Sequence, residues 1–143
     1  MSKMVRDNLS IHTDDYNFDI LLNGPIVGVF GNSGVGKSLY FDLVRSLSDI
    51  EVGQIKNVEC FNYENSNQNN ILDKLREIHD TLVLIDNADI LLTQMEAPRF
   101  LYESDNQYLI MTRCSSFLGI PITSRAELVN YDGTKFRLEY LRG

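Results

Sequence analysis

The stretch Gly31-Asn32-Ser33-Gly34-Val35-Gly36-Lys37-Ser38 decides the fold of this 143-residue chain. It follows the pattern G-x-x-x-x-G-K-S. An apolar run from Pro25 to Phe30 precedes it and is typical of a buried strand, and the amphipathic stretch from Leu39 to Leu47 that follows is typical of a helix. A strand, a glycine-rich loop and a helix in this order are the setting in which the pattern forms a phosphate-binding loop, or P-loop.

The residue types of this loop suit a nucleotide phosphate. The glycines let the backbone turn sharply and approach phosphate oxygens, so that amide N–H groups and the positive end of the helix face the anion. Lys37 supplies a positive charge for the outer phosphates, and the hydroxyl of Ser38 is a suitable Mg²⁺ ligand. The expected nucleotide-binding residues are Gly31, Asn32, Ser33, Gly34, Val35, Gly36, Lys37, Ser38 and Leu39.

The composition limits the class of protein. Hydrophobic residues make up 43% of the chain and charged residues 23%, which is ordinary for a globular protein of one domain. The formal charge of −7 makes the chain a poor general binder of nucleic acid or of an anionic membrane, and we expect neither as a partner. The two cysteines, Cys60 and Cys114, match no metal-binding spacing. With no visible signal peptide and no apolar run of membrane-spanning length, we expect reduced thiols in a cytoplasmic protein.

The rest of the chain alternates between strand and helix patterns. Strands are expected in a hairpin between residues 5 and 22, at 54–63, 81–85 and 108–111, and in a hairpin of 127–131 and 134–140 around Asp132-Gly133. An Asn/Gln-rich loop at 62–70 leads to a helix cap, and helical segments are expected at 71–78, at 90–95 and from Pro98 onward. The sequence predicts one α/β domain spanning 1–143, with a mostly parallel central sheet and antiparallel strands at both chain ends.

Asp86 stands directly after the apolar run Thr81-Leu82-Val83-Leu84-Ile85. Ligands in a parallel sheet bind at the carboxyl ends of the strands, where Asp86 would lie. We therefore expect Asp86 and Ser38 to hold Mg²⁺ together, Asp86 through a water molecule.

These motifs resemble those of the P-loop NTPases. The segment from Val83 to Asp89 resembles the Walker B segment of ATPases with an extra strand between the two motifs, which include the AAA, ABC-type and signal-transduction (STAND) groups. Thr112-Arg113, after the run from Leu109, resembles the γ-phosphate sensor of the STAND group, whereas the strands at the chain ends look more like ABC-type or RecF-like domains. The resemblance implies a three-layer fold and ATP with Mg²⁺ as cofactors.

The chain departs from these families at one catalytic position. Many of them carry a glutamate after the Walker B aspartate as general base, whereas this chain has Asn87, an amide that orients water and cannot accept its proton. Asp89 is either a substitute base or a helix cap, and Arg113 is either a neutralising group for the γ-phosphate or a surface arginine. The candidate catalytic residues are Lys37, Asp86, Asn87, Asp89 and Arg113.

Three functions remain open at this stage. The first is a MgATP-binding switch with slow or partner-activated hydrolysis, and the second is a non-catalytic nucleotide-binding module, which Asn87 favours. The third is a small-molecule kinase, for which Arg99 is the sole arginine between Asp86 and Arg113. No lid or ABC-like signature is visible, so we expect an open site that a protein partner or a second copy of the chain completes. A guanine-reading Asn-Lys-x-Asp motif is missing, which favours ATP over GTP.

Overall fold

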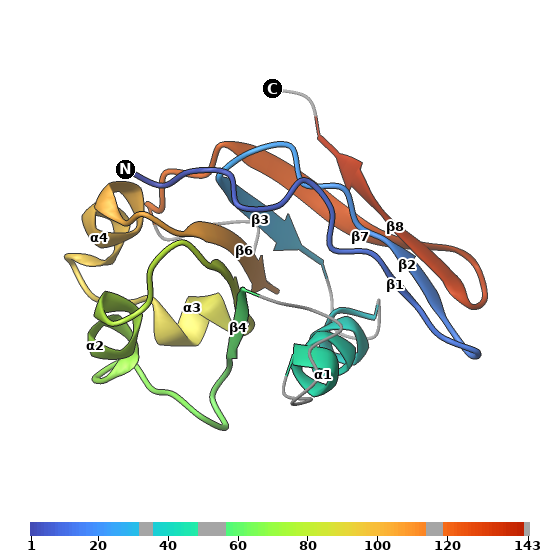
Figure 1. Ribbon diagram of the computed structural model, residues 1–143, viewed down its shortest axis with the longest axis horizontal. Helices are drawn as coiled ribbons and strands as arrows, with labels where there is room; N and C mark the ends of the chain where they lie inside the picture. The colour runs from blue at the N-terminus through green and yellow to red at the C-terminus, as the bar shows by residue number, and fades with distance from the viewer. Residues whose placement is uncertain (32–35, 49–56, 114–118, 142–143) are drawn as a thin grey trace.

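The computed structural model describes residues 1–31, 36–48, 57–113 and 119–141, and their strands form one mixed sheet (Figure 1). The sheet has eight strands in the order β1-β2-β8-β7-β3-β6-β5-β4. The strands are β1 (Ile11–His12), β2 (Asn17–Asp19), β3 (Ile26–Phe30), β4 (Val58–Phe61), β5 (Leu82–Ile85), β6 (Gln107–Thr112), β7 (Ser124–Asp132) and β8 (Lys135–Tyr140). The helices are α1 (Lys37–Ser48), α2 (Ile71–Arg76), α3 (Ala88–Leu91) and α4 (Ala97–Glu103). The predicted α/β class with a mixed sheet is therefore confirmed.

The strands that carry the two motifs lie in the parallel part of the sheet. β3 pairs with β6, β6 with β5 and β5 with β4, all in parallel register. β6 therefore separates β3, which leads into the glycine loop, from β5, which ends before Asp86. All residues of β5 and β6 are buried, as expected of continuous apolar runs covered on both faces.

Each face of the parallel strands belongs to a different hydrophobic cluster. Val27 and Val29 of β3 pack in the cluster that contains Tyr40, Phe41 and Val44 of α1. The second cluster contains the alternate residues of β5 and β6 together with the buried residues of α2, α3 and α4. Figure 1 shows these three helices on the left of the view and α1 to their right. Side chains of successive strand residues point to opposite faces, which explains this division.

The strands near the two chain ends form antiparallel hairpins, as predicted, and they extend the same sheet. β1 pairs with β2 and β7 with β8 in antiparallel register. β7 also lies parallel to β3, and β2 lies parallel to β8. These two parallel contacts join the hairpins to β3, and no local pattern in the sequence predicts them.

Two local predictions differ from the structure. The helix expected at 90–95 is α3, which ends at Leu91, and the side chain of Met95 is 97% exposed. The N-cap residue of α2 is Asn70, whose side chain makes no capping hydrogen bond. Instead, Oδ1 of Asn67 accepts hydrogen bonds from the backbone N–H groups of Asn69 at 2.8 Å and Asn70 at 3.0 Å. The strand expected at 54–63 begins at Val58, and residues 49–56 lie outside the described residues.

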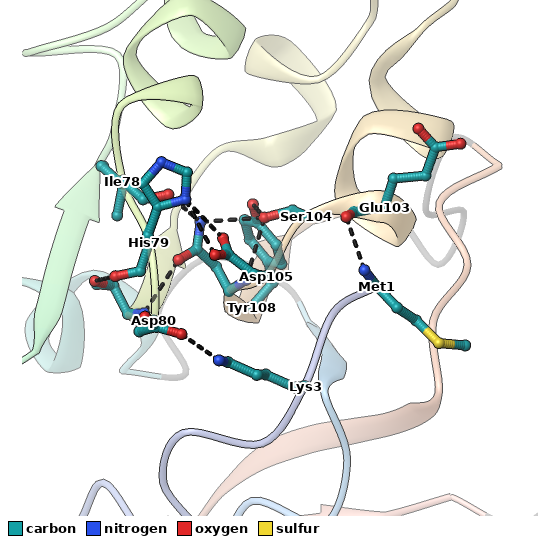
Figure 2. Close-up of polar contacts among 11 residues, drawn as sticks. Met1, Lys3, Ile78, His79, Asp80, Glu103, Ser104, Asp105 and Tyr108 are labelled. Atoms are coloured by element: carbon teal, nitrogen blue, oxygen red, sulfur yellow. Dashed lines mark hydrogen bonds and ion pairs between the residues drawn. The ribbon is translucent and has the colours of Figure 1, made fainter.

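Polar contacts hold residues 1–6 across the amino ends of β5 and β6, and Figure 2 shows those of Met1 and Lys3. The N-terminal amine donates to the carbonyl oxygen of Glu103 at 2.8 Å, and Lys3 pairs with Asp80. The fully buried Gln107 accepts from the backbone N–H of Arg6 at 2.8 Å through Oε1. These contacts lie at the opposite end of the strands from Asp86, so we assign them to the stability of the fold.

Candidate nucleotide site

The structure describes the two ends of the predicted phosphate loop, which lie at the end of β3 and at the start of α1. Gly31 follows Phe30 directly, and Gly36 precedes the first residue of α1. Gly36 has a φ of +103°, which glycine adopts at little cost. The predicted ligands Asn32, Ser33, Gly34 and Val35 lie outside the described residues.

Lys37, the first residue of α1, is held back against its own loop. Its side chain is buried, and Nζ donates a hydrogen bond to the carbonyl oxygen of Gly31 at 2.5 Å. Burial lowers the pKa of Lys37, the nearby carboxylate of Asp86 raises it, and the cation of Arg113 lowers it further.

Asp86 lies at the carboxyl end of β5, beside the end of β4. Its backbone N–H donates to the carbonyl oxygen of Phe61 at 2.9 Å, and its carboxylate Oδ1 accepts from the N–H of Asn87 at 2.9 Å. The residue is buried, and this burial raises the pKa of its carboxyl group, against the opposing effects of the Asn87 hydrogen bond and of Lys37. A buried carboxylate next to a buried ammonium is expensive to maintain, which is typical of functional sites.

Asn87 and Asp89 occupy the start of α3, and the helix-capping role predicted for Asp89 is not found there. Asn87 is the N-cap residue, with a left-handed backbone at φ +55° and no capping hydrogen bond from its side chain. Asp89 lies within the helix, so the capping role expected of it is not observed. Oδ1 of each residue is buried without a hydrogen-bond partner among the described residues.

A cavity of about 840 Å³ opens at the carboxyl ends of the strands. It brings together most of the described residues that the sequence predicts for the site, and Gly31 and Asp89 are not among its lining residues. Its volume falls within the range of small-molecule sites. The lining residues are Tyr16, Gly36, Lys37, Ser38, Leu39, Asp42, Asn62, Tyr63, Glu64, Asp86, Asn87, Ile90, Arg113, Asn130, Gly133 and Phe136.

Four residues of the terminal hairpins line one side of this cavity, and the sequence did not predict them: Tyr16, Asn130, Gly133 and Phe136. They reach the cavity because β7 lies beside β3 and β8 beside β2. No local motif predicts these four residues, because their place in the cavity depends on strand pairing between distant segments.

An aromatic cluster connects these hairpins to the phosphate loop. The rings of Phe18 and Phe136 stack with centroids 4.4 Å apart and planes at 10°. Tyr16 approaches Phe136 at 6.3 Å, and Phe18 approaches Tyr40 of α1 at 5.1 Å. A Cβ atom added to Gly36 would lie 2.7 Å from Cε1 of Phe136, so the ring fits against the loop only because residue 36 is glycine.

An ionic network between α1 and the segment after β4 includes two residues that line the cavity, Asp42 and Glu64. Arg45 pairs with Asp42 at 3.2 Å and with Glu64 at 3.1 Å. Glu64 follows β4, the strand next to β5. The sequence could have indicated it, because ligands bind at the carboxyl ends of parallel strands.

The residues present suit Mg²⁺ in its usual role beside a nucleotide. Ser38 is exposed in the cavity, and the carboxylate of Asp86 lines the same space. Mg²⁺ binds proteins through one or two oxygen ligands and completes its shell with phosphate oxygens and water. Among residues 1–31, 36–48, 57–113 and 119–141 there is no group of three or more His, Cys, Asp or Glu side chains that could hold a metal without such help.

Comparison with known proteins identifies a similar fold and no family. No protein-family model and no curated protein matches the chain. The solved structure of "RNase-L Inhibitor" is similar over 92% of this chain, with a TM-score of 0.51 and 11% sequence identity. The complex of the archaeal ribosomal stalk protein aP1 and the archaeal ribosome recycling factor aABCE1 matches over 92% of the chain at a TM-score of 0.49 and 11% identity. The chain spans 38% of the matched chain in each case.

Within the described part of the chain, no helix is both long and apolar enough to span a membrane.

Proposed function

We propose that this chain is a MgATP-binding protein of the P-loop NTPase class, with a three-layer α/β fold, that hydrolyses ATP slowly or when a partner activates it. The observation that carries the proposal is the cavity at the carboxyl ends of β3, β5 and β6, which Gly36, Lys37 and Ser38 line together with Asp86. A P-loop lysine and serine facing a buried aspartate across a nucleotide-sized space is the arrangement that MgATP requires.

The phosphates would lie against the start of α1. The first backbone N–H groups of a helix have no hydrogen-bond acceptor within the helix, and the helix dipole favours an anion at this end. Lys37 would leave the carbonyl oxygen of Gly31 and bind the outer phosphates instead, because an anion is a stronger partner than a neutral carbonyl. Ser38 and Asp86 would hold Mg²⁺, and Arg113 would neutralise charge on the γ-phosphate.

The base of the nucleotide would lie toward the terminal hairpins. Tyr16 is partly buried, lines the cavity and belongs to the aromatic cluster beside Gly36. Aromatic rings stack on nucleotide bases, and such contacts depend little on which base is present.

Hydrolysis without help would be slow. Water must attack the γ-phosphorus while the bond to the bridging oxygen breaks and ADP leaves, and a base must take the proton of that water. Asn87 cannot accept a proton, and Asp89 does not line the cavity. We propose that a protein partner or a second copy of this chain covers the site, next to the exposed side chains of Tyr63 and Ile90 at its rim.

One alternative has an observation in its favour. Asn87 at the expected base position, with a left-handed backbone that suits asparagine, is also what a nucleotide-binding module without catalysis would carry. The kinase alternative gains no such support, because Arg99 pairs with Glu103 on α4 and does not line the cavity.

Phosphate release separates the two candidates. The assay would compare the wild-type chain with Lys37→Ala at saturating MgATP, with and without high protein concentration to allow self-association. A wild-type rate above that of the variant supports an ATPase. If the wild type binds ATP but releases phosphate no faster than Lys37→Ala, the function is that of the non-catalytic module.

A further inference from the structure

The turn between β7 and β8 presents an oriented amide on the side of the cavity where the base would lie. Asn130 and Gly133 both line the cavity. Nδ2 of Asn130 donates a hydrogen bond to the carbonyl oxygen of Gly133 at 3.1 Å. This bond uses one of the two N–H groups of Nδ2 and fixes the orientation of the amide, with Oδ1 as the acceptor that the side chain offers to a ligand.

Strand pairing fixes the position of this amide relative to the phosphate loop. Asn130 is the direct partner of Phe136 in the antiparallel pair of β7 and β8. Direct partners point to the same face of the sheet with Cβ atoms about 5 Å apart. The ring of Phe136 lies against Gly36. Asn130 is therefore the neighbour of the side chain that covers the start of α1. A nucleoside attached to phosphates at Gly36–Ser38 is long enough to reach it.

We propose that Asn130 reads the 6-position of the purine and selects adenine over guanine, an inference that rests on the proposed function. Adenine carries an amino group at this position, which donates a hydrogen bond, whereas guanine carries a carbonyl oxygen, which accepts one. Oδ1 of Asn130 pairs with the amino group and opposes the carbonyl oxygen. Tyr16 supplies the stacking surface, and Asn130 supplies the discrimination that stacking lacks.

The expected discrimination is modest because Asn130 is exposed. A single neutral hydrogen bond in such a setting changes affinity by about three- to tenfold. ITP is the most informative competitor, because hypoxanthine has the 6-carbonyl of guanine and lacks its 2-amino group. ITP and GTP should therefore bind equally, and both more weakly than ATP.

The test is displacement of a ribose-labelled fluorescent ATP analogue by ATP, GTP and ITP in the presence of Mg²⁺. In the wild type, ATP should displace the analogue at about three- to tenfold lower concentration than GTP or ITP. Asn130→Ala should bring the three nucleotides to equal affinity. Asn130→Lys, which replaces the acceptor with a donor, should favour GTP and ITP. Glu127→Ala is the matched control, because Glu127 lies on the same strand and does not line the cavity.

Two results would overturn the assignment of Asn130. One is equal binding of ATP, GTP and ITP by the wild type. The other is an ATP preference that persists in Asn130→Ala or, if that variant does not fold, in Asn130→Lys. Each of these outcomes leaves the site itself intact, whereas failure of the wild type to bind the analogue or any competitor would remove the proposed function as well.

Discussion

Replacement of Gly36 by alanine tests the contact between the phosphate loop and the terminal hairpins. At Gly36 the backbone φ is +103°, and a new Cβ would lie 2.7 Å from Cε1 of Phe136, well inside the usual carbon–carbon contact distance of about 3.5–4.0 Å. An unfavourable backbone conformation costs about 1–3 kcal/mol, and overpacking of a filled core costs about 1–3 kcal/mol. We therefore expect Gly36→Ala to lower the free energy of unfolding by about 2–6 kcal/mol.

Gly133→Ala is the control for the backbone contribution. Gly133 has a φ of +54°, and an added Cβ would meet no atom within 4 Å. Only the left-handed conformation is penalised there, at about 1–2 kcal/mol. Urea denaturation of both variants gives the difference, which contains the collision with Phe136 together with any difference in backbone strain between φ +103° and φ +54°.

A double-mutant cycle assigns that collision to one ring. In a Phe136→Ala background, Gly36→Ala should cost less than in the wild type, with a coupling energy of about 1–3 kcal/mol. Equal losses for Gly36→Ala and Gly133→Ala, or a cycle without coupling, would refute the packing of β8 against the loop.

Three further predictions concern the polar residues of the site. Burial raises the pKa of Asp86 above 3.8, so its charged form destabilises the native state at neutral pH and this penalty disappears as the pH falls through the raised pKa toward 3.8. Asp86→Asn should therefore unfold at higher denaturant concentration than the wild type at pH 7, with the gap closing toward pH 4; a gap that does not depend on pH would contradict this. Ser38→Ala should weaken ATP binding several-fold when Mg²⁺ is present and little in EDTA, measured by equilibrium dialysis, and equal losses in both buffers would exclude Ser38 as a metal ligand. Asn87→Glu should raise the rate of phosphate release while lowering stability by about 1–2 kcal/mol, because glutamate tolerates the φ of +55° less well than asparagine; an unchanged rate would place the base elsewhere.

The parallel core was predictable from the sequence because its signals are local. The runs before Gly31 and Asp86 are continuous and apolar, as expected of strands buried on both faces, and a turn signal follows each of them. Pro98 correctly marked the start of α4, since proline fits the first turn of a helix.

The length of α3 and the pairing of the terminal hairpins were not predictable in the same way. The apolar residues from Ile90 to Met95 suggested a longer helix, although the backbone leaves the helical conformation at Leu92, with ψ +53°, and Met95 faces solvent. The parallel contacts of β7 with β3 and of β2 with β8 join segments about one hundred residues apart. Short-range periodicity contains no information on such pairing.

The residues of the candidate site likewise divide into those that local motifs predict and those that only the sheet order brings to the cavity. Lys37, Ser38, Asp86 and Arg113 were found from the sequence because a loop motif and strand ends position them, and the structure places all four around one cavity. Tyr16, Asn130 and Phe136 entered the site only through the sheet order, so a search for motifs could not reveal them.

The most direct test of the proposed site is a calorimetric titration of MgATP into the wild-type chain and into Lys37→Ala, with circular dichroism to show that both are folded. Lys37 is the ammonium of the loop, and its loss leaves the phosphates facing Asp86 without that charge. We predict saturable binding by the wild type and no detectable binding by the variant. Equal heats of binding in the two proteins, or none in a folded wild type, would contradict the assignment of this cavity to a nucleotide.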